Sequence, residues 1–306
     1  MNIMRFKWLY FLISAMVIIP GIFSLFKWGL KPSIDFTGGT LLELELEKEI
    51  TSDRLSAISE TIKDSGFNVS SIQLSGTNKV LIKTQPIERG EATSLISAIG
   101  QKLNEKPTEL RFDTVGPILG KELIKKTVIG ILLASSFILL YVSRQFSDPM
   151  FGISAILAMF HDSLVLLGIF SLLGHFKGVE IDTLYVTAVL TILSFSVHDT
   201  VVVYDRIRES QKKFPGVPFV DLVNKAVTET LSRSINNSMT IIFMLIALYL
   251  LGGATTKWFI FALLVGTISG TYSSTFTAAP LLVVWCNLRE LRRQRRLILP
   301  FFKKTF

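Results

Sequence analysis

The chain has 306 residues, of which 49% are hydrophobic, with a mean hydropathy of +0.49 and a formal net charge of +8. This composition excludes an ordinary soluble domain and predicts an integral membrane protein. The charge does not indicate nucleic-acid binding, because it is unevenly distributed: residues 31–122 carry 11 Lys and Arg against 14 Asp and Glu, and the remaining residues carry 21 against 10.

Six segments are apolar over the roughly 20 residues that a helix needs to cross about 30 Å of hydrocarbon. They are residues 8–26, 123–142, 150–173, 184–204, 235–252 and 258–285. The first lacks a small-x-small cleavage pattern, so we expect an uncleaved helix there rather than a signal peptide. Basic residues fall on one side of a six-span topology, and the positive-inside rule then predicts that both termini are cytoplasmic. Residues 1–30 are the predicted N-terminus and first span, and residues 289–306 a basic cytoplasmic tail.

Residues 31–122, between the first two spans, are expected to form a small α+β domain outside the cytoplasm. Leu42 and Leu44 alternate with glutamates, which is the period of two of a half-buried strand. The expected elements are strands at 41–47, 69–74, 79–84 and 109–114 and helices that begin near residues 51 and 92. The order β-α-β-β-α-β predicts a ferredoxin-like fold.

A polar stretch joins the first span to this domain. It consists of Asp35, Phe36, Thr37, Gly38 and Gly39. Two glycines permit tight backbone angles, so the stretch is either a simple turn or a hinge that transmits movement between the domain and the membrane.

Two carboxylates, Asp162 and Asp199, fall within predicted spans. An ionisable group at the centre of a bilayer costs about 3 kcal/mol or more and usually marks an ion or proton path. The alternative is a structural hydrogen bond between helices. Two such acids in one small bundle favour a shared functional site.

His161 and His198 each precede one of these acids in the chain. Consecutive helical residues point to different faces, so we do not expect either histidine to pair with its neighbouring acid. Each remains a candidate for a relay with another helix.

Residues 123–288 are expected to contain spans two to six and, near residues 219–233, an amphipathic helix on the cytoplasmic membrane surface. Arg233 closes that helix. Its side chain either extends to lipid headgroups or turns toward Asp199. In the second case its permanent positive charge lowers the proton affinity of the carboxylate when the two are close, and this effect is lost when they are distant.

The sixth span contains Gly266 and Gly270, a small-xxx-small spacing that permits close helix packing. We assign the hydroxyl residues around them to packing as well. The lone Cys286 forms no intrachain disulfide, and no Cys/His spacing suggests a metal. Without a paired-aspartate or His-Glu-x-x-His motif, we expect no catalytic site and no cofactor.

Four motifs together resemble SecF, the family of accessory subunits of the Sec protein translocase. They are residues 35–39, His161 with Asp162, residues 199–209 and residues 230–234. The resemblance covers nearly the whole chain, and the motif at 199–209 is its most specific part. One departure is His198, where the family often has Asn.

The resemblance implies a multi-pass protein of the bacterial inner membrane that packs with SecD as pseudo-symmetric halves, like transporters of the resistance-nodulation-division superfamily. It implies association with the SecYEG channel and the SecA ATPase, with unfolded preprotein as substrate and YajC and YidC as further candidate partners. SecD and SecF would use the proton gradient to complete export. Asp199 would carry the proton with Arg233 as its switching partner, and Asp162 and His198 are further relay candidates.

Two other functions stay open. One is a passive scaffold that holds SecD or other translocase parts, with structural acids only. The other is a small-molecule exporter of the same superfamily, although such pumps typically carry two large external domains on twelve spans.

Overall fold

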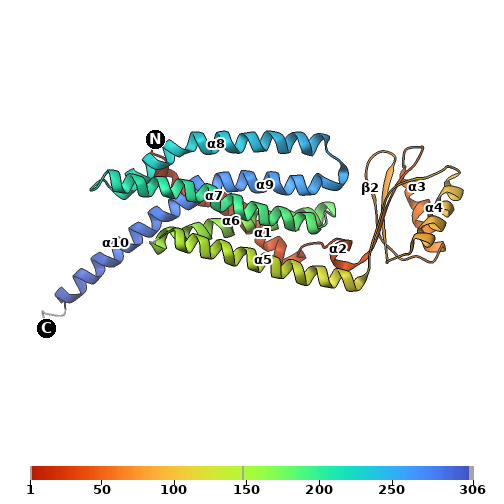
Figure 1. Cartoon of the computed structure of the whole chain (residues 1–306), viewed down its shortest axis with the longest axis horizontal. Coiled ribbons are helices and arrows are strands. Elements are labelled where there is room, and N and C mark those ends of the chain that lie inside the picture. The colour runs from red at the N-terminus through yellow and green to blue at the C-terminus, as the bar shows by residue number, and fades with distance from the viewer. Residues whose placement is uncertain (1, 147, 303–306) are drawn as a thin grey trace. The chain divides into compact units, whose positions relative to one another are not determined.

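The structure is a computed structural model and describes residues 2–146 and 148–302. These residues form two compact units (Figure 1). The helical unit comprises the described residues of Met1–Lys31, Ile131–Val179 and Leu184–Phe306, and the sheet unit comprises Pro32–Gly130 and Glu180–Thr183. The last four residues of the predicted basic tail, 303–306, lie outside the described residues.

Six helical stretches among the described residues are long and apolar enough to cross a membrane, and each matches one predicted span. Five contain their predicted span in full, and the fifth in chain order ends at Leu251, one residue before the predicted end. The helices are α1 (Lys7–Trp28), α5 (Pro117–Gln145), α6 (Pro149–Lys177), α7 (Thr183–Lys213), α8 (Phe219–Leu251) and α9 (Lys257–Ser273). A short 3-10 helix, Ile3–Phe6, precedes α1, and another, Ala254–Thr256, precedes α9. The chain is therefore a polytopic helical membrane protein.

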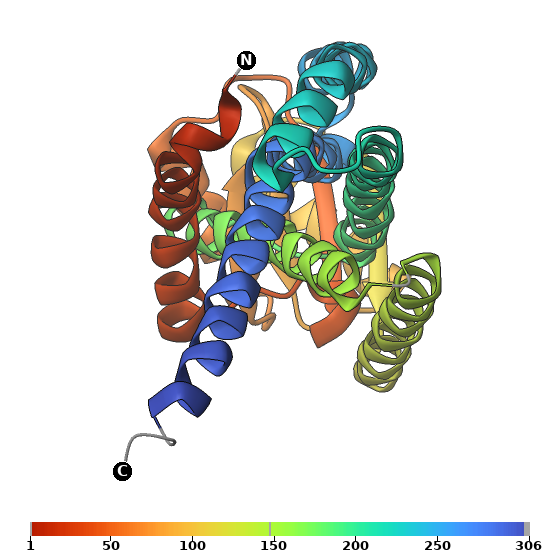
Figure 2. The ribbon, with the colours of Figure 1, turned by 90° about the vertical axis from the view of Figure 1, so that its left-hand side faces the viewer.

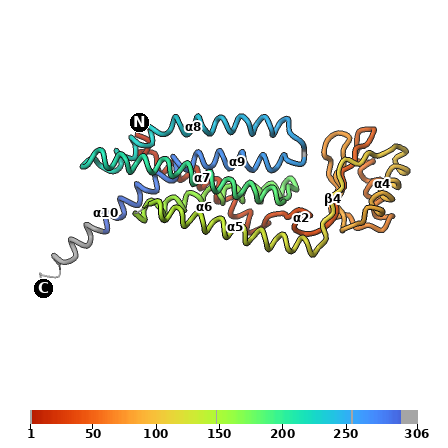
Figure 3. The backbone as a smooth tube through the Cα atoms, viewed as in Figure 1, coloured from red at the N-terminus to blue at the C-terminus, as the bar shows by residue number. Residues whose placement is uncertain are grey.

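The sixth span changes its helical type in the middle. After α9, residues Ser274–Ala278 form a π-helix, and α10 (Ala279–Phe302) continues from it (Figure 3). Single π-turns inside longer helices are rare and frequently occur at functional sites.

The predicted amphipathic segment differs from expectation. Residues 219–233 are not a separate surface helix but the first part of α8, which runs without a break to Leu251. Its apolar residues Leu222, Val223 and Val227 are buried within the helical unit. No glycine or proline lies between 219 and 251, so nothing in the sequence interrupts the helix before the span.

The sheet unit contains α2 (Ile34–Thr37) and four strands with two further helices. In chain order these are β1 (Gly39–Glu45), α3 (Ser52–Asp64), β2 (Val69–Leu74), β3 (Lys79–Thr84), α4 (Arg89–Leu103) and β4 (Thr108–Val115). The strands lie in the order β2-β3-β1-β4 and every neighbouring pair is antiparallel. In β1 the alternating leucines are buried: Leu42 lies opposite Ile82 and Leu44 opposite Val80.

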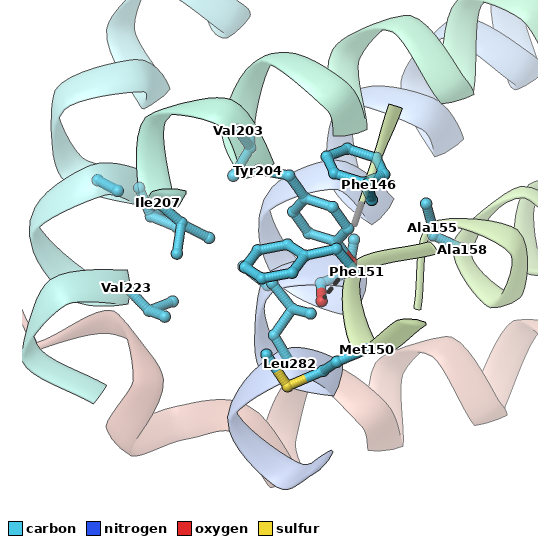
Figure 4. Packing of buried hydrophobic residues seen from close by; sticks show 14 of the residues in the cluster. Phe146, Met150, Phe151, Ala155, Ala158, Val203, Tyr204, Ile207, Val223 and Leu282 are labelled. Carbon is cyan, nitrogen blue, oxygen red and sulfur yellow. Dashed lines mark hydrogen bonds between the residues drawn. The ribbon is translucent and has the colours of Figure 1, made fainter. Parts of the chain in front are cut away.

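The core of the helical unit gathers where α5, α6, α7 and α10 meet. Phe146, Phe151 and Tyr204 pack with ring centroids 5.4 to 5.8 Å apart (Figure 4). The Tyr204 hydroxyl donates a hydrogen bond to the carbonyl oxygen of Ala278 in the π-helix, at 3.0 Å. The π-helix is thus fixed against α7. Figure 2, which views the chain from one end, shows α10 as the blue helix that runs toward the C-terminal end.

Candidate functional site

The helical unit buries both predicted acids: Asp162 on α6 is 1% exposed and Asp199 on α7 is 8% exposed. Among the described residues, neither carboxylate forms an ion pair with a lysine or arginine. Serine hydroxyl groups contact both acids instead.

Asp162 accepts hydrogen bonds from three serines on two other helices. Ser196 of α7 donates to Oδ2 at 2.5 Å, Ser273 of α9 donates to Oδ2 at 2.6 Å, and Ser269 of α9 donates to Oδ1 at 2.6 Å. All three hydroxyl groups belong to buried residues. The carboxylate therefore links α6, α7 and α9 in the interior of the unit.

His161 adds a fourth contact to Asp162, and here the sequence-based expectation is wrong. Its Nδ1 lies 3.0 Å from Asp162 Oδ1, while Nε2 lies 2.9 Å from Ser14 Oγ on α1. The rule for consecutive helical residues describes only the directions in which the Cα–Cβ bonds leave the helix. The imidazole ring of His161 extends beyond its Cβ atom, and with Nε2 bound to Ser14 its Nδ1 reaches the carboxyl group of the next residue. Ser14 in turn lies 3.4 Å from Thr277 Oγ1 in the π-helix.

Asp199 is held by serines from two other segments. Ser234 of α8 lies within hydrogen-bonding distance of both carboxylate oxygens, at 2.9 Å from Oδ1 and 2.8 Å from Oδ2. Ser274, the first residue of the π-helix, donates to Oδ2. The acid therefore joins α7 to α8 and to the sixth span.

A cavity of about 340 Å³ opens beside Asp199. Its lining residues are His198, Asp199, Val202, Val203, Thr230, Arg233, Ser234 and Asn237. A second cavity of about 440 Å³ shares Val202, Thr230 and Arg233 with it and is otherwise lined by charged residues of α7 and α8. The two cavities are thus neighbours, and one of them borders the buried acid.

Arg233 lines both cavities but does not pair with Asp199; its side chain is exposed, and the next residue, Ser234, makes the contact instead. His198 is also exposed and lines the cavity beside Asp199. The structure therefore brings three of the four relay candidates to one cavity and places Asp162 in a separate, buried cluster.

The packing interpretation of the hydroxyl residues in span six was incomplete. Ser269, Ser273 and Ser274 donate to the two acids, as do Ser196 and Ser234 elsewhere. The sequence does carry a signal for this role, because several serines recur within one apolar helix. Hydroxyl groups inside a membrane need hydrogen-bond partners within the protein.

The two predicted packing glycines face α7. A Cβ atom at Gly266 would lie 2.2 Å from Ile192 Cδ1, and one at Gly270 would lie 3.2 Å from Phe195 Cδ1. Because glycine has no Cβ atom, the sixth span can approach α7 closely at these positions. They lie beside Ser269 and Ser273, which bind Asp162.

Residues 35–39 form the start of the sheet unit. Asp35 Oδ2 accepts hydrogen bonds from the backbone N–H and the hydroxyl of Thr183, at 3.1 and 2.8 Å. Phe36 is buried, and Thr37 bonds back to the carbonyl of Ser33 at 3.0 Å.

The two glycines of this stretch have conformations that other residues adopt poorly. Gly38 has φ +77° and Gly39 has φ +138°, and a Cβ at Gly39 would lie 2.8 Å from the carbonyl oxygen of Thr84. The turn is thus tightly fitted between α2 and β3.

Comparison with known proteins gives two family matches and a set of relatives. Residues 96–288 match the family described as protein export membrane protein SecD/SecF, C-terminal, and residues 23–50 match the SecD/SecF GG motif. The chain is 42% identical over 310 residues to the protein translocase subunit SecF of Thermobaculum terrenum, covering 96% of this chain and 97% of that one. The Synechocystis protein of the same name is 33% identical, covering 97% and 98%.

A longer relative and its structure also match. The protein translocase subunit SecDF of Thermus thermophilus is 36% identical, covering 87% of this chain and 36% of that one. The crystal structure of SecDF from that organism, a translocon-associated membrane protein, superposes with a TM-score of 0.83 at 33% identity, covering 94% of this chain and 39% of that chain. The chain thus spans about two fifths of that structure's length.

Proposed function

Because the chain belongs to the SecD/SecF family of protein export membrane proteins, we propose that it is a translocase subunit that, with SecD, couples the proton motive force to protein export. The relative named SecDF supports the pairing with SecD, since one chain there matches 87% of this chain and also contains further sequence. SecYEG, SecA and an unfolded preprotein complete the proposed assembly, with YajC and YidC as additional candidates.

The proposed location is the bacterial inner membrane, with both termini cytoplasmic and the sheet unit external. An even number of spans and the concentration of basic residues outside 31–122 support this topology. The strand order β2-β3-β1-β4 with two helices supports a ferredoxin-like assignment for the sheet unit.

The observation that carries the proposed mechanism is Asp199, a carboxylate buried in a membrane helix beside a cavity that Arg233 also lines. A proton that reaches Asp199 through this cavity neutralises it. The acid then becomes a donor as well as an acceptor, so its contacts with Ser234 and Ser274 must rearrange. Because these serines lie on α8 and the sixth span, the change of charge alters the packing of three spans.

The energy available is sufficient for such a change. Moving one charge through about 100 mV gives roughly 2.3 kcal/mol, which shifts a two-state equilibrium by nearly two powers of ten. Arg233 is the proposed switching partner: its side chain can approach the ionised carboxylate through the cavity that both line.

The scaffold function has its own support, because Asp199 accepts hydrogen bonds from serines of two other segments and makes no ion pair with Arg233 among the described residues. Replacing Asp199 by Asn separates the two functions. Proton-driven coupling predicts that D199N vesicles, with the complex assembled, lose the gradient-dependent stage of export and keep the ATP-driven stage. Export at the native rate in D199N would favour the scaffold.

A further inference from the structure

We propose that Asp35 and the Lys83–Glu180 ion pair clamp the first turn of α7 to the sheet unit, so that movement of the helix that carries Asp199 reaches the sheet unit directly. This inference rests on the proposed function and names positioning residues for it. It adds a route at α7 to the covalent connections between the units that follow α1 and run through α5.

The first part of the clamp is a helix cap supplied from far away in the chain. Thr183 begins α7, and its N–H and hydroxyl both donate to Asp35 Oδ2, 148 positions earlier. A helix start has unsatisfied N–H groups and a partial positive charge, so a carboxylate there is a favourable partner. By contrast, α6 is capped by its own flanking residue, Asp148, whose Oδ1 accepts a hydrogen bond from the Met150 N–H at 3.0 Å.

The second part is an ion pair between the loop before α7 and the sheet. Lys83 of β3 bonds to Glu180, and the two side chains are only 10% and 11% exposed. A pair so withdrawn from water costs much more to break than an exposed one, because each partner would be left as a buried charge.

The third part is a backbone connection. The Ser33 N–H donates to the carbonyl of Ile181 at 2.8 Å, and Pro32 forms an isolated parallel bridge with the same residue. Residues 180–183 are therefore attached to the sheet unit by main chain, ion pair and helix cap. They group with that unit even though the sequence places them between two spans.

The helix beyond the clamp is suited to transmit displacement. It runs from Thr183 to Lys213 with neither glycine nor proline, so no kink is expected along it. Asp199 lies 16 positions after Thr183, about 24 Å along the axis at 1.5 Å per residue. A shift of α7 when Asp199 changes charge thus also shifts Thr183 and the residues bound to it.

The test uses the full chain assembled with SecD and the channel in membrane vesicles, and compares D35A, D35N and D199N. We expect D35A to slow the gradient-dependent stage by about tenfold, the order of one lost charge-assisted contact, with the ATP-driven stage unchanged. Hydrogen exchange at the amides of residues 183–185 should become faster in the same variant. Asn keeps an acceptor oxygen, so D35N should recover most of the rate and of the protection.

Asp53, an exposed acid in the first turn of α3, provides the matched control. We expect D53A to behave as the native chain in both measurements. If D35A does not assemble, T183A decides, because it removes one of the two bonds and leaves the backbone contact. It should slow the gradient-dependent stage by about threefold.

The outcomes separate this inference from the function on which it rests. Native rates and native exchange in D35A, or in T183A where D35A does not assemble, overturn the clamp, while loss of the gradient-dependent stage in D199N still upholds proton coupling. Native export in D199N overturns proton coupling itself. The clamp as a route for proton-driven movement is then overturned with it, whatever the exchange data show.

Discussion

Ser273 and Ser274 are adjacent in the chain, yet their hydroxyl groups serve different buried carboxylates. Ser273, at the end of α9, donates to Asp162 at 2.6 Å, whereas Ser274, at the start of the π-helix, donates to Asp199. If either acid changes its charge, the hydrogen bond of its own serine changes, and that serine is the direct neighbour of the serine that binds the other acid. The contacts of the two acids therefore adjoin at the junction of α9 and the π-helix, and also along α7, which carries both Asp199 and Ser196, a donor to Asp162.

This connection predicts that both acids contribute to coupling. Each of S273A and S274A should slow the gradient-dependent stage of export by about five- to tenfold, since one hydrogen bond to a carboxylate is worth roughly 1–1.5 kcal/mol. The control is S163A, because the Ser163 hydroxyl bonds to the carbonyl of Met159 in its own helix. Native export in S273A together with slow export in S274A would place Asp162 outside the relay.

Replacing Asp162 should destabilise the helical unit strongly. D162A leaves three serine hydroxyls and His161 without their acceptor, and we expect a loss of about 3 kcal/mol or more in unfolding free energy. D162N keeps one acceptor oxygen and should lose clearly less. Thermal unfolding of the purified chain in detergent measures both, and equal midpoints for D162A and the native chain would contradict the structural role of the cluster.

Arg233 should matter for coupling and not for stability. Its side chain is exposed and lines the cavity beside Asp199, so R233Q removes the cation from the cavity without opening a buried cluster. We expect gradient-dependent export to fall at least about tenfold while the unfolding free energy changes by less than about 0.5 kcal/mol. K212Q, at an exposed position near the end of α7, should change neither quantity.

Gly39 should not tolerate alanine. Its φ of +138° is unfavourable for other residues, and the added Cβ would lie 2.8 Å from the Thr84 carbonyl oxygen. We expect G39A to lower stability by about 2 kcal/mol or more. Gly29 gives a matched comparison, because its φ is +67° but a Cβ there would meet no atom within 4 Å, so G29A should cost about 1 kcal/mol. The comparison requires thermal unfolding of the full-length variants, and similar losses in both would mean that the contact with Thr84 is unimportant.

The sequence by itself determined the membrane class, the six spans and the order of strands and helices in the sheet unit. Each of these follows from a local pattern: about 20 apolar residues for a span, and alternation such as Leu42 and Leu44 between glutamates for a strand. It also marked Asp162 and Asp199, because a charge within an apolar run is visible without knowing its neighbours.

Only the tertiary structure decided which groups meet those acids. It gave Asp199 the hydroxyls of Ser234 and Ser274, brought His161 into contact with Asp162, and capped α7 with Asp35. Apart from His161, these partners lie 35 to 148 positions along the chain from the residues they contact. Periodicity reports which face of an element is apolar, but the register in which two helices cross is fixed by packing of the whole unit, and that register selects the hydrogen-bond partners.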